Sequence, residues 1–253
     1  MSHSSIVRST ILALAMLVTG CSSGPATQPQ TAQEYPEPVF TPERMLQEDI
    51  QDPAYTYDPW QGMNKRIYNF NYHFDQKVFL PVVRGYKWAV PQFARTGVHN
   101  FFNNFRDVRT MVNSVLQLAP DKFYESTGRV FVNSTLGIFG LFDVASAMDI
   151  PRPQEDFGQT LGYWGVGQGP YLVIPLLGPS NLRDGFGMLP DLYVQSVVRD
   201  EVLSKPLRST AFLFESIDTR ANTSFRYYET GSAFEYRMVR WLYSTKRELD
   251  VAK

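Results

Sequence analysis

Glycine is concentrated in one part of this 253-residue chain, and that concentration is the strongest limit on its fold. Ten of the 17 glycines lie between Gly137 and Gly187. Because glycine weakens both helices and strands, this region is expected to be an irregular insertion of turns and extended segments. We place the insertion at residues 136–187, inside a helical domain that covers residues 58–249.

Two apolar stretches inside the insertion are too short to cross a membrane. The first covers residues 136–142 and ends at Asp143, and the second covers residues 171–177, contains Pro175 and stops at Gly178. A membrane-spanning helix needs about 20 apolar residues. Irregular backbone at membrane depth is tolerated where protein covers it or water lines it, so the two stretches together suggest the wall of a channel or groove.

Helical patterns lie on both sides of the insertion. Asp58, Pro59 and Gln61 resemble an N-cap, a proline at the first helical position and a capping box, which predicts a helix from near residue 59. Four apolar residues then follow at the spacing of one helix face: Met63, Ile67, Phe70 and Phe74. Similar patterns predict helices within residues 91–120, 191–203, 206–221 and 232–249.

The apolar stripes of these helices allow two interpretations. Such stripes normally pack into a core. Aromatic residues are crowded on the first helices, however, and aromatic rings with polar edges favour a membrane interface. The crowded residues are Tyr68, Tyr72, Tyr86, Trp88, Phe101 and Phe102. The aromatic content favours a mainly α fold of amphipathic helices lying in that interface.

The chain contains a single cysteine, Cys21, which follows a short apolar run. One cysteine cannot form a disulfide within the chain. Arg8 precedes the run, which predicts a signal peptide over residues 1–20 that ends in a lipobox-like Leu-Val-Thr-Gly-Cys sequence. Acylation of Cys21 would anchor the chain to a membrane. Ser22 and Ser23 resemble the sorting signal of a lipoprotein that is sent to the outer membrane of a Gram-negative bacterium. The proline-rich residues 21–57 are expected to form a tether.

Charge and motif content exclude several kinds of function. With 24 basic and 25 acidic residues, the chain lacks the basic excess of a nucleic-acid-binding protein. His73 and His99 have no ligand-spaced partners, so we expect no metal and no cofactor. The sequence around Ser180 begins like the GxSxG nucleophile elbow of serine hydrolases but lacks the final glycine. Ser180 is therefore expected in a turn or cap. Arg183 and Asp184 are interpreted as a surface ion pair more readily than as a catalytic or gating pair. Because no set of catalytic residues is found, we predict that the protein is not an enzyme.

Several sequence motifs together resemble the VacJ family of outer-membrane lipoproteins, also called MlaA. They extend over residues 58–225 and include Asp-Pro-Trp-Gln-Gly-Met-Asn at 58–64, Asn-Ser-Thr-Leu-Gly at 133–137, Phe-Gly-Gln-Thr-Leu-Gly at 157–162, Leu-Arg-Asp at 182–184 and Asp-Thr-Arg-Ala at 218–221. One departure is the tether before Asp58, which is longer than the short lead of the family.

The resemblance implies a ring of helices embedded in the inner leaflet of the outer membrane around a central amphipathic channel. It also implies that misplaced phospholipids leave the outer leaflet through this channel for a soluble periplasmic carrier, MlaC, with trimeric porins as partners. The alternatives are a periplasmic lipid or cell-wall hydrolase and a structural lipoprotein that braces porins.

Candidate channel residues follow from this interpretation. Polar side chains remove the cost of moving a headgroup through hydrocarbon. The candidates for channel lining or gating are Asn69, Phe70, Asn71, Gly137, Phe139, Gly140, Asp143, Arg183 and Asp184. We expect residues 137–142 to form a mobile gating hairpin. Valine at both Gly137 and Gly140 is expected to preserve folding while changing lipid passage.

Overall fold

The computed structural model describes residues 56–253 apart from residues 230 and 233. They belong to one compact unit, which begins at Asp52. The predicted signal peptide, Cys21 and nearly all of the predicted tether lie outside the described residues. The described part is mainly helical, as the sequence predicts. Its elements are α3 (Gln61–Phe74), the π-helix η1 (Asp75–Phe79), α4 (Leu80–Ala89), α5 (Gln92–Leu116), α6 (Pro120–Thr135), α7 (Val144–Ala147), α8 (Phe157–Tyr163), β1 (Tyr171–Ile174), β2 (Gly178–Asn181), α9 (Leu182–Val202), α10 (Lys205–Asn222) and α11 (Glu235–Ala252).

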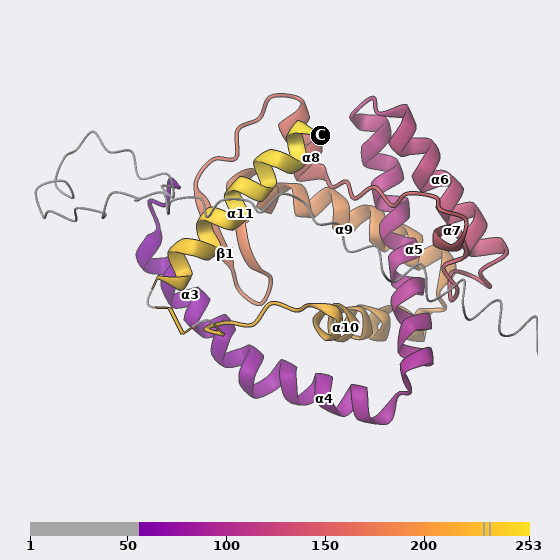
Figure 1. Ribbon diagram of the computed structural model, residues 1–253, viewed down its shortest axis with the longest axis horizontal. Coiled ribbons are helices and arrows are strands. Elements are labelled where there is room, and N and C mark those ends of the chain that lie inside the picture. The colour runs from indigo at the N-terminus through magenta and orange to yellow at the C-terminus, as the bar shows by residue number, and fades with distance from the viewer. Residues whose placement is uncertain (1–55, 230, 233) are drawn as a thin grey trace, which may run out of the picture. The chain divides into compact units, whose positions relative to one another are not determined.

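The elements of this unit form a closed circuit of contacts. From α3 the circuit passes through η1, α4, α10, α5, α9, α8, α11, β2 and β1, and β1 contacts α3 again. Figure 1 shows the indigo α3 and the yellow α11 on the same side of this circuit, although they come from opposite ends of the described chain. The helices therefore form a ring, with α6 packed on α5 and α7 packed on α6. Within the described residues, no helix is both long and apolar enough to cross a bilayer.

The start of α3 lies close to the predicted residue 59, but its capping differs from the prediction. The helix begins at Gln61, and the N-cap residue Trp60 makes no side-chain capping bond. Asp58 was expected to cap this helix, but its carboxylate instead accepts hydrogen bonds from Asn64 at 2.8 Å and from Tyr236 at 2.6 Å. The capping-box prediction is wrong because the carboxylate binds the side chains of Asn64 in α3 and Tyr236 in the distant helix α11, and not the main-chain N–H groups at the helix start.

The predicted apolar stripe of α3 is not the buried face of the helix. Met63 and Phe70 are 47% and 51% exposed. The buried residues have the same spacing shifted by one position: Asn64, Tyr68, Asn71 and Asp75. Three of these four are polar, so α3 turns a polar face inward and much of its apolar stripe outward.

The glycine-rich insertion contains the only strands among the described residues. β1 and β2 pair antiparallel, with Tyr171 opposite Asn181 and Ile174 opposite Gly178. The expectation of extended segments in the insertion is confirmed by β1 and β2. Ser180 lies in β2 and is fully buried, so its predicted place in a turn or cap is wrong. Within the described residues, this strand pair connects α11 to α3 in the circuit.

Candidate functional site: a polar interior and an apolar exterior

Polar side chains dominate the interior of the ring unit. Among the described residues, buried polar and charged side chains outnumber buried apolar ones. Small apolar clusters remain, such as the one formed by Tyr68, Tyr171, Val173 and Tyr236. Since soluble proteins normally bury apolar side chains and leave charged ones outside, this pattern is inverted.

Large apolar side chains are correspondingly exposed. Helix α9 shows the inversion most clearly, because its two faces have opposite character. Its exposed face carries Leu182, Phe186, Leu189, Tyr193 and Val197, and its buried face carries Arg183, Asp184, Gly187 and Asp191. Exposed apolar surface on this scale marks a protein or membrane contact.

Two asparagines of α3 bind the main chain of β1 and of the turn that follows it. The Asn64 amide donates to the Tyr171 carbonyl at 3.0 Å and accepts from the Val173 N–H at 2.9 Å. One heptad later, the Asn71 amide donates to the Ile174 carbonyl at 3.0 Å and accepts from the Leu176 N–H at 2.8 Å. Each side-chain amide thus takes the place of a peptide group on a neighbouring strand. We call these four bonds the asparagine ladder.

The three predicted site residues of α3 lie in different environments. Asn71 is buried in the asparagine ladder, whereas Asn69 and Phe70 are exposed. Phe70 stacks on Phe74, with ring centroids 6.1 Å apart. Asn71 therefore positions the strand pair, and only Asn69 and Phe70 remain available to contact a passing molecule.

Arg129 of α6 is the centre of a second buried cluster. Its guanidinium donates to the Ile150 carbonyl at 2.6 Å and to the Asp143 carboxylate at 2.7 Å, and it lies 3.4 Å from Asp107. Asn133 adds a bond to Asp143 at 3.1 Å. Asp143 also caps α7 by accepting from the Ser146 N–H. The predicted site residue Asp143 therefore has a structural role: it connects α6 to the start of α7, directly after residues 136–142.

Residues 136–142 form a compact turn, where the sequence predicted a hairpin. The Gly140 N–H donates to the Asn133 carbonyl at 2.8 Å, and the Phe142 N–H donates to the Gly137 carbonyl at 2.9 Å. The two glycines are buried, while the side chain of Phe139 is 75% exposed. Other apolar side chains of the turn are also exposed, namely Leu136, Ile138, Leu141 and Phe142.

The glycines of this turn leave no space for a side chain. A Cβ at Gly137 would lie 2.2 Å from the Phe142 carbonyl oxygen, and one at Gly140 would lie 3.0 Å from Asn104. Gly140 also has a φ of +86°, which glycine adopts at little cost. The expectation that valine at both positions preserves folding is therefore wrong, because Gly137 is required for close packing of the backbone.

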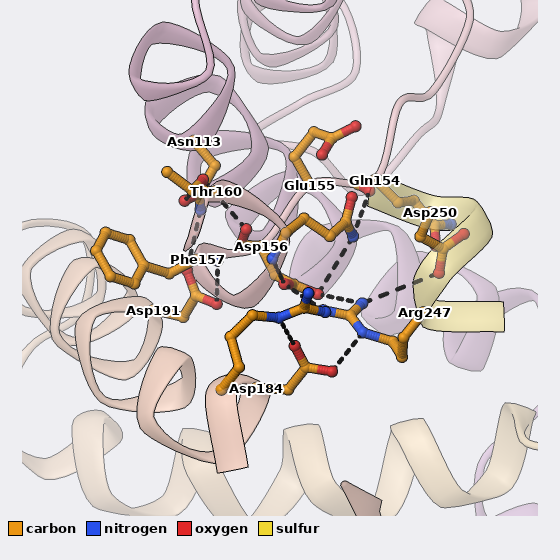
Figure 2. A network of polar contacts seen from close by, with 12 residues as sticks. Asn113, Gln154, Glu155, Asp156, Phe157, Thr160, Asp184, Asp191, Arg247 and Asp250 are labelled. Atoms are coloured by element: carbon orange, nitrogen blue, oxygen red, sulfur yellow. Dashed lines mark hydrogen bonds and ion pairs between the residues drawn. The ribbon is translucent and has the colours of Figure 1, made fainter. Parts of the chain in front are cut away.

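A third cluster joins α8, α9 and α11 around Arg247 (Figure 2). The Arg247 guanidinium binds the Asp184 carboxylate at 2.6 Å and the Asp156 carboxylate at 2.8 and 2.9 Å. Arg183 donates to Asp184 at 2.9 Å, and Tyr243 donates to it at 2.9 Å. Arg183 and Asp184 are both buried, so their interpretation as a surface ion pair is wrong. We call this cluster the Arg247 corner.

The charges of the Arg247 corner shift the pKa values of its carboxyl groups. Burial by itself would raise the pKa of Asp184, but the hydrogen bond and charge of Arg247, with the charge of Arg183, lower it below its ordinary value. The pKa of Asp156 is lowered in the same way, with Arg247 outweighing the effect of burial. Both groups are therefore held as carboxylates.

The opposite side of the circuit is held by a buried ion pair and a hydrogen bond. The Arg220 guanidinium of α10 donates to both carboxylate oxygens of Asp75 in η1, at 2.6 and 2.7 Å. His99 of α5 lies 2.8 Å from Asp218 of α10. Polar contacts therefore connect α10 to η1 and α5, on the side of the circuit away from α8.

The buried polar groups serve mainly as connections between elements. Within residues 56–253, apart from the two positions not described, no group of His, Cys, Asp and Glu side chains is arranged to hold a metal ion. The arrangement offers polar walls inside and apolar surface outside, which is the distribution expected of a protein that contacts lipid and retains polar groups within.

A family model described as "MlaA lipoprotein" matches residues 56–250 of the chain. The chain belongs to the MlaA lipoprotein family. The match covers nearly all of the described residues, including the asparagine ladder, the Arg129 cluster and the Arg247 corner. A solved chain from work on the structural basis for maintenance of bacterial outer membrane lipid asymmetry matches with a TM-score of 0.64 and 31% identity, covering 78% of this chain and 100% of that one.

Individual MlaA-type relatives match over shorter lengths. The intermembrane phospholipid transport system lipoprotein MlaA of Escherichia coli is 37% identical over 169 residues, which cover 65% of this chain and 66% of the relative. An uncharacterized protein of Rickettsia prowazekii is 41% identical over 128 residues, which cover 51% of each chain. The chain thus spans about half the length of the rickettsial relatives that it matches.

Several buried connecting residues were not found by sequence reasoning, among them Asn64, Arg129 and Arg247. One signal was available for Asn64. Asn64, Tyr68, Asn71 and Asp75 follow the helix period as regularly as the apolar stripe does. A search for apolar stripes alone passes over a polar stripe, which is the buried one in this protein.

Proposed function

We propose that this protein removes mislocalised phospholipids from the outer leaflet of a Gram-negative outer membrane and thereby maintains lipid asymmetry. The observation that carries the proposal is the inverted burial in a closed circuit of helices: charged residues inside and large apolar residues outside. Family membership supports the same function, since an Escherichia coli relative is named a phospholipid transport lipoprotein. The proposed activity is transport without covalent chemistry.

The inverted burial suits the transport of an amphipathic molecule. A charged headgroup that enters hydrocarbon alone loses its hydration at a cost of several kcal/mol or more. A ring with a polar interior can offer the headgroup hydrogen-bonding partners, while acyl chains remain against apolar surface. We therefore propose an amphipathic channel within the ring, with helices lying in the membrane interface.

The candidate residues are proposed to act in two ways. Asn71, Asp143, Arg183 and Asp184 would hold the wall in place, because their polar groups are already bound within the protein. Asn69, Phe70 and Phe139 would contact lipid, because their side chains are exposed. We propose that Gly137 and Gly140 shape a fixed apolar projection rather than a mobile gate.

Anchoring and partners complete the proposal. Acylated Cys21 would hold the protein on the periplasmic side of the outer membrane, with residues 21–57 as its tether. A soluble periplasmic carrier, MlaC, would receive the lipid, and a trimeric porin would hold the ring in the membrane. Replacing Cys21 with Ala should deplete the protein from outer-membrane fractions, whereas unchanged partitioning and acyl mass would contradict the anchor.

The test is the phospholipid content of the outer leaflet in cells that lack the protein. We expect phospholipid to accumulate there, and the wild-type gene to reverse the accumulation. Normal asymmetry in the deletion strain would overturn the proposal. Measurements with purified protein distinguish the alternatives. Hydrolysis of lipid or peptidoglycan fragments that depends on the protein would favour a hydrolase. Porin binding without any effect on lipid would favour a structural lipoprotein that braces porins.

A further inference from the structure

A cavity of about 460 Å³ lies at one side of the ring unit, lined by residues of α5, α6, α11 and the connection before α8. Its positively charged lining residues are Arg109, Lys122, Arg152, Lys246, Arg247 and Lys253. Three acidic residues, Glu155, Asp156 and Asp250, also line it. The wall of the cavity therefore has an excess of positive charge.

Most of the cations around the cavity already have partners in the protein. Lys122 binds Glu155 at 2.8 Å, and Arg152 lies 3.3 Å from Asp107 in the Arg129 cluster. Arg247 is bound in the Arg247 corner, and Figure 2 shows its contacts with Asp156 and Asp250 at the border of this region. Lys246 and Lys253 both pair with Asp250.

Arg109 differs from the other five cations. Within the described residues, its side chain makes no hydrogen bond and no ion pair, and its Nε atom is buried without a partner. The side chain is only partly exposed, so bulk water does not fully hydrate it. A guanidinium in such a position has desolvation as a cost and no hydrogen-bond acceptor in the described part of the protein. Its compensation is the longer-range attraction of the Asp156 and Asp191 carboxylates.

We propose that the cavity binds a phosphate group, with Arg109 as its principal ligand. The guanidinium presents several N–H donors in a planar fork that matches the oxygens of a phosphate. The other cations at the wall would add electrostatic attraction for the phosphate. The main contribution would come from Lys246 and Lys253, because these two positive charges share one carboxylate, Asp250. The phosphate can belong to a phospholipid headgroup or to a free phosphate ion. The site stands on charge and geometry and does not require the transport proposal.

Arg109→Gln is a suitable test variant because the change removes no hydrogen bond and no ion pair of the side chain within the described residues. The full chain, purified in neutral detergent without phosphate, should melt in Arg109→Gln at the wild-type temperature or slightly above it, because a poorly compensated charge is removed. Inorganic phosphate and the deacylated headgroup glycerophosphoethanolamine are then titrated separately, with binding measured by calorimetry and by the rise in melting temperature. Arg84→Gln on α4 is the control, since it removes an equal charge from an exposed residue outside the cavity.

We expect at least one of the two probes to bind the wild type and the Arg84→Gln variant equally. Its affinity should fall by about tenfold or more in Arg109→Gln, the size expected for loss of a charged hydrogen bond. Binding of the glycerophosphodiester alone would assign the site to lipid headgroups, and binding of inorganic phosphate alone would assign it to the free ion. Absence of binding by both probes, or equal binding by wild type and Arg109→Gln, would overturn the proposal.

Discussion

The Arg247 corner and the asparagine ladder both close the ring, but they use opposite chemistry. At the corner, full charges of α8, α9 and α11 meet around one buried guanidinium, with oxygen distances from 2.6 to 2.9 Å. At the ladder, neutral amides of α3 bind the main chain of β1 and of the following turn at 2.8 to 3.0 Å. The donor–acceptor distances are similar in the two junctions. Losing a partner at the corner leaves a buried charge, whereas losing one at the ladder leaves a neutral group.

The comparison shows how a ring with a polar interior can be stable. Removing one member of a buried ion pair leaves a charge without compensation, which costs more than leaving an amide partner unbound. The corner is therefore the junction more sensitive to mutation and acid. The ladder carries no titrating group in its four bonds, so its contribution should not depend on pH.

The largest expected effect is that of Arg247→Met. The change leaves the carboxylates of Asp156 and Asp184 without their main partner, and we expect the free energy of unfolding to fall by about 3–5 kcal/mol. Chemical denaturation in detergent, followed by circular dichroism, measures it. Lys246→Met on the same helix is the control, because its side chain is 70% exposed, and it should cost at most about 0.5 kcal/mol. Equal losses in the two variants would contradict the importance of the corner.

A smaller effect is expected for Asn71→Ala. The change leaves the Leu176 N–H and the Ile174 carbonyl without partners, at a cost of about 1–3 kcal/mol. Asn69→Ala is the control, since Asn69 is exposed on the same helix and should change stability by no more than about 0.5 kcal/mol. Hydrogen exchange at Leu176 should accelerate only in Asn71→Ala. Unchanged protection there would show that the ladder does not hold the strand pair.

The two junctions should also respond differently to pH. The folded-state pKa values of Asp156 and Asp184 are lowered, so their stabilising effect is fully present above the unfolded pKa of about 3.9 and is lost as pH falls toward the folded value. For Asp184 the effect amounts to about 1.4 kcal/mol for each unit by which its pKa is lowered.

Denaturation between pH 7 and pH 3 measures this difference. The stability gap between wild type and Asp184→Asn should narrow as the pH falls, while the gap between wild type and Asn71→Ala should stay constant. A gap for Asp184→Asn that widens on acidification would mean that the sign of the pKa shift is wrong.

Salt is expected to have the smallest effect. Buried ion pairs are screened much less than exposed ones, so raising sodium chloride from 0.05 to 0.5 M should change wild-type stability by less than about 1 kcal/mol. A larger loss would indicate that exposed ion pairs, rather than the Arg247 corner, hold the ring together.

Much of the helical fold could be predicted from the sequence, because the 3.6-residue period and the glycine-rich interruption are local signals. The direction in which each helix faces could not. The stripe through Met63 and Phe70 was expected to mark a buried or membrane-facing side, and the inward face was found one residue further along. Periodicity fixes the angle between residues on a helix, but whether lipid or protein lies beside the apolar face depends on the surroundings.

The site residues were predicted with less success, for a related reason. Asp143, Arg183 and Asp184 were chosen for their polarity within an apolar region. Arg183 pairs with its neighbour Asp184, but Asp143 and Asp184 have their arginine partners, Arg129 and Arg247, on other elements. No local pattern reports a contact between residues 63 positions apart. The requirement for Gly137 was likewise hidden, because it comes from a carbonyl that the turn brings within 2.2 Å of the missing Cβ.

Contact between lipid and the exposed apolar face of α9 tests the central claim most directly. Single cysteines carrying a fluorophore are placed at Leu189 or Glu248 in a Cys21→Ala background, and the protein is reconstituted in nanodiscs that contain spin-labelled phospholipid. Leu189 is 65% exposed on the apolar face, and Glu248 is an exposed charged residue of α11. The account predicts strong quenching by lipid at residue 189 and weak quenching at residue 248. Equally weak quenching at both positions would show that the apolar exterior does not meet lipid, and would contradict the account.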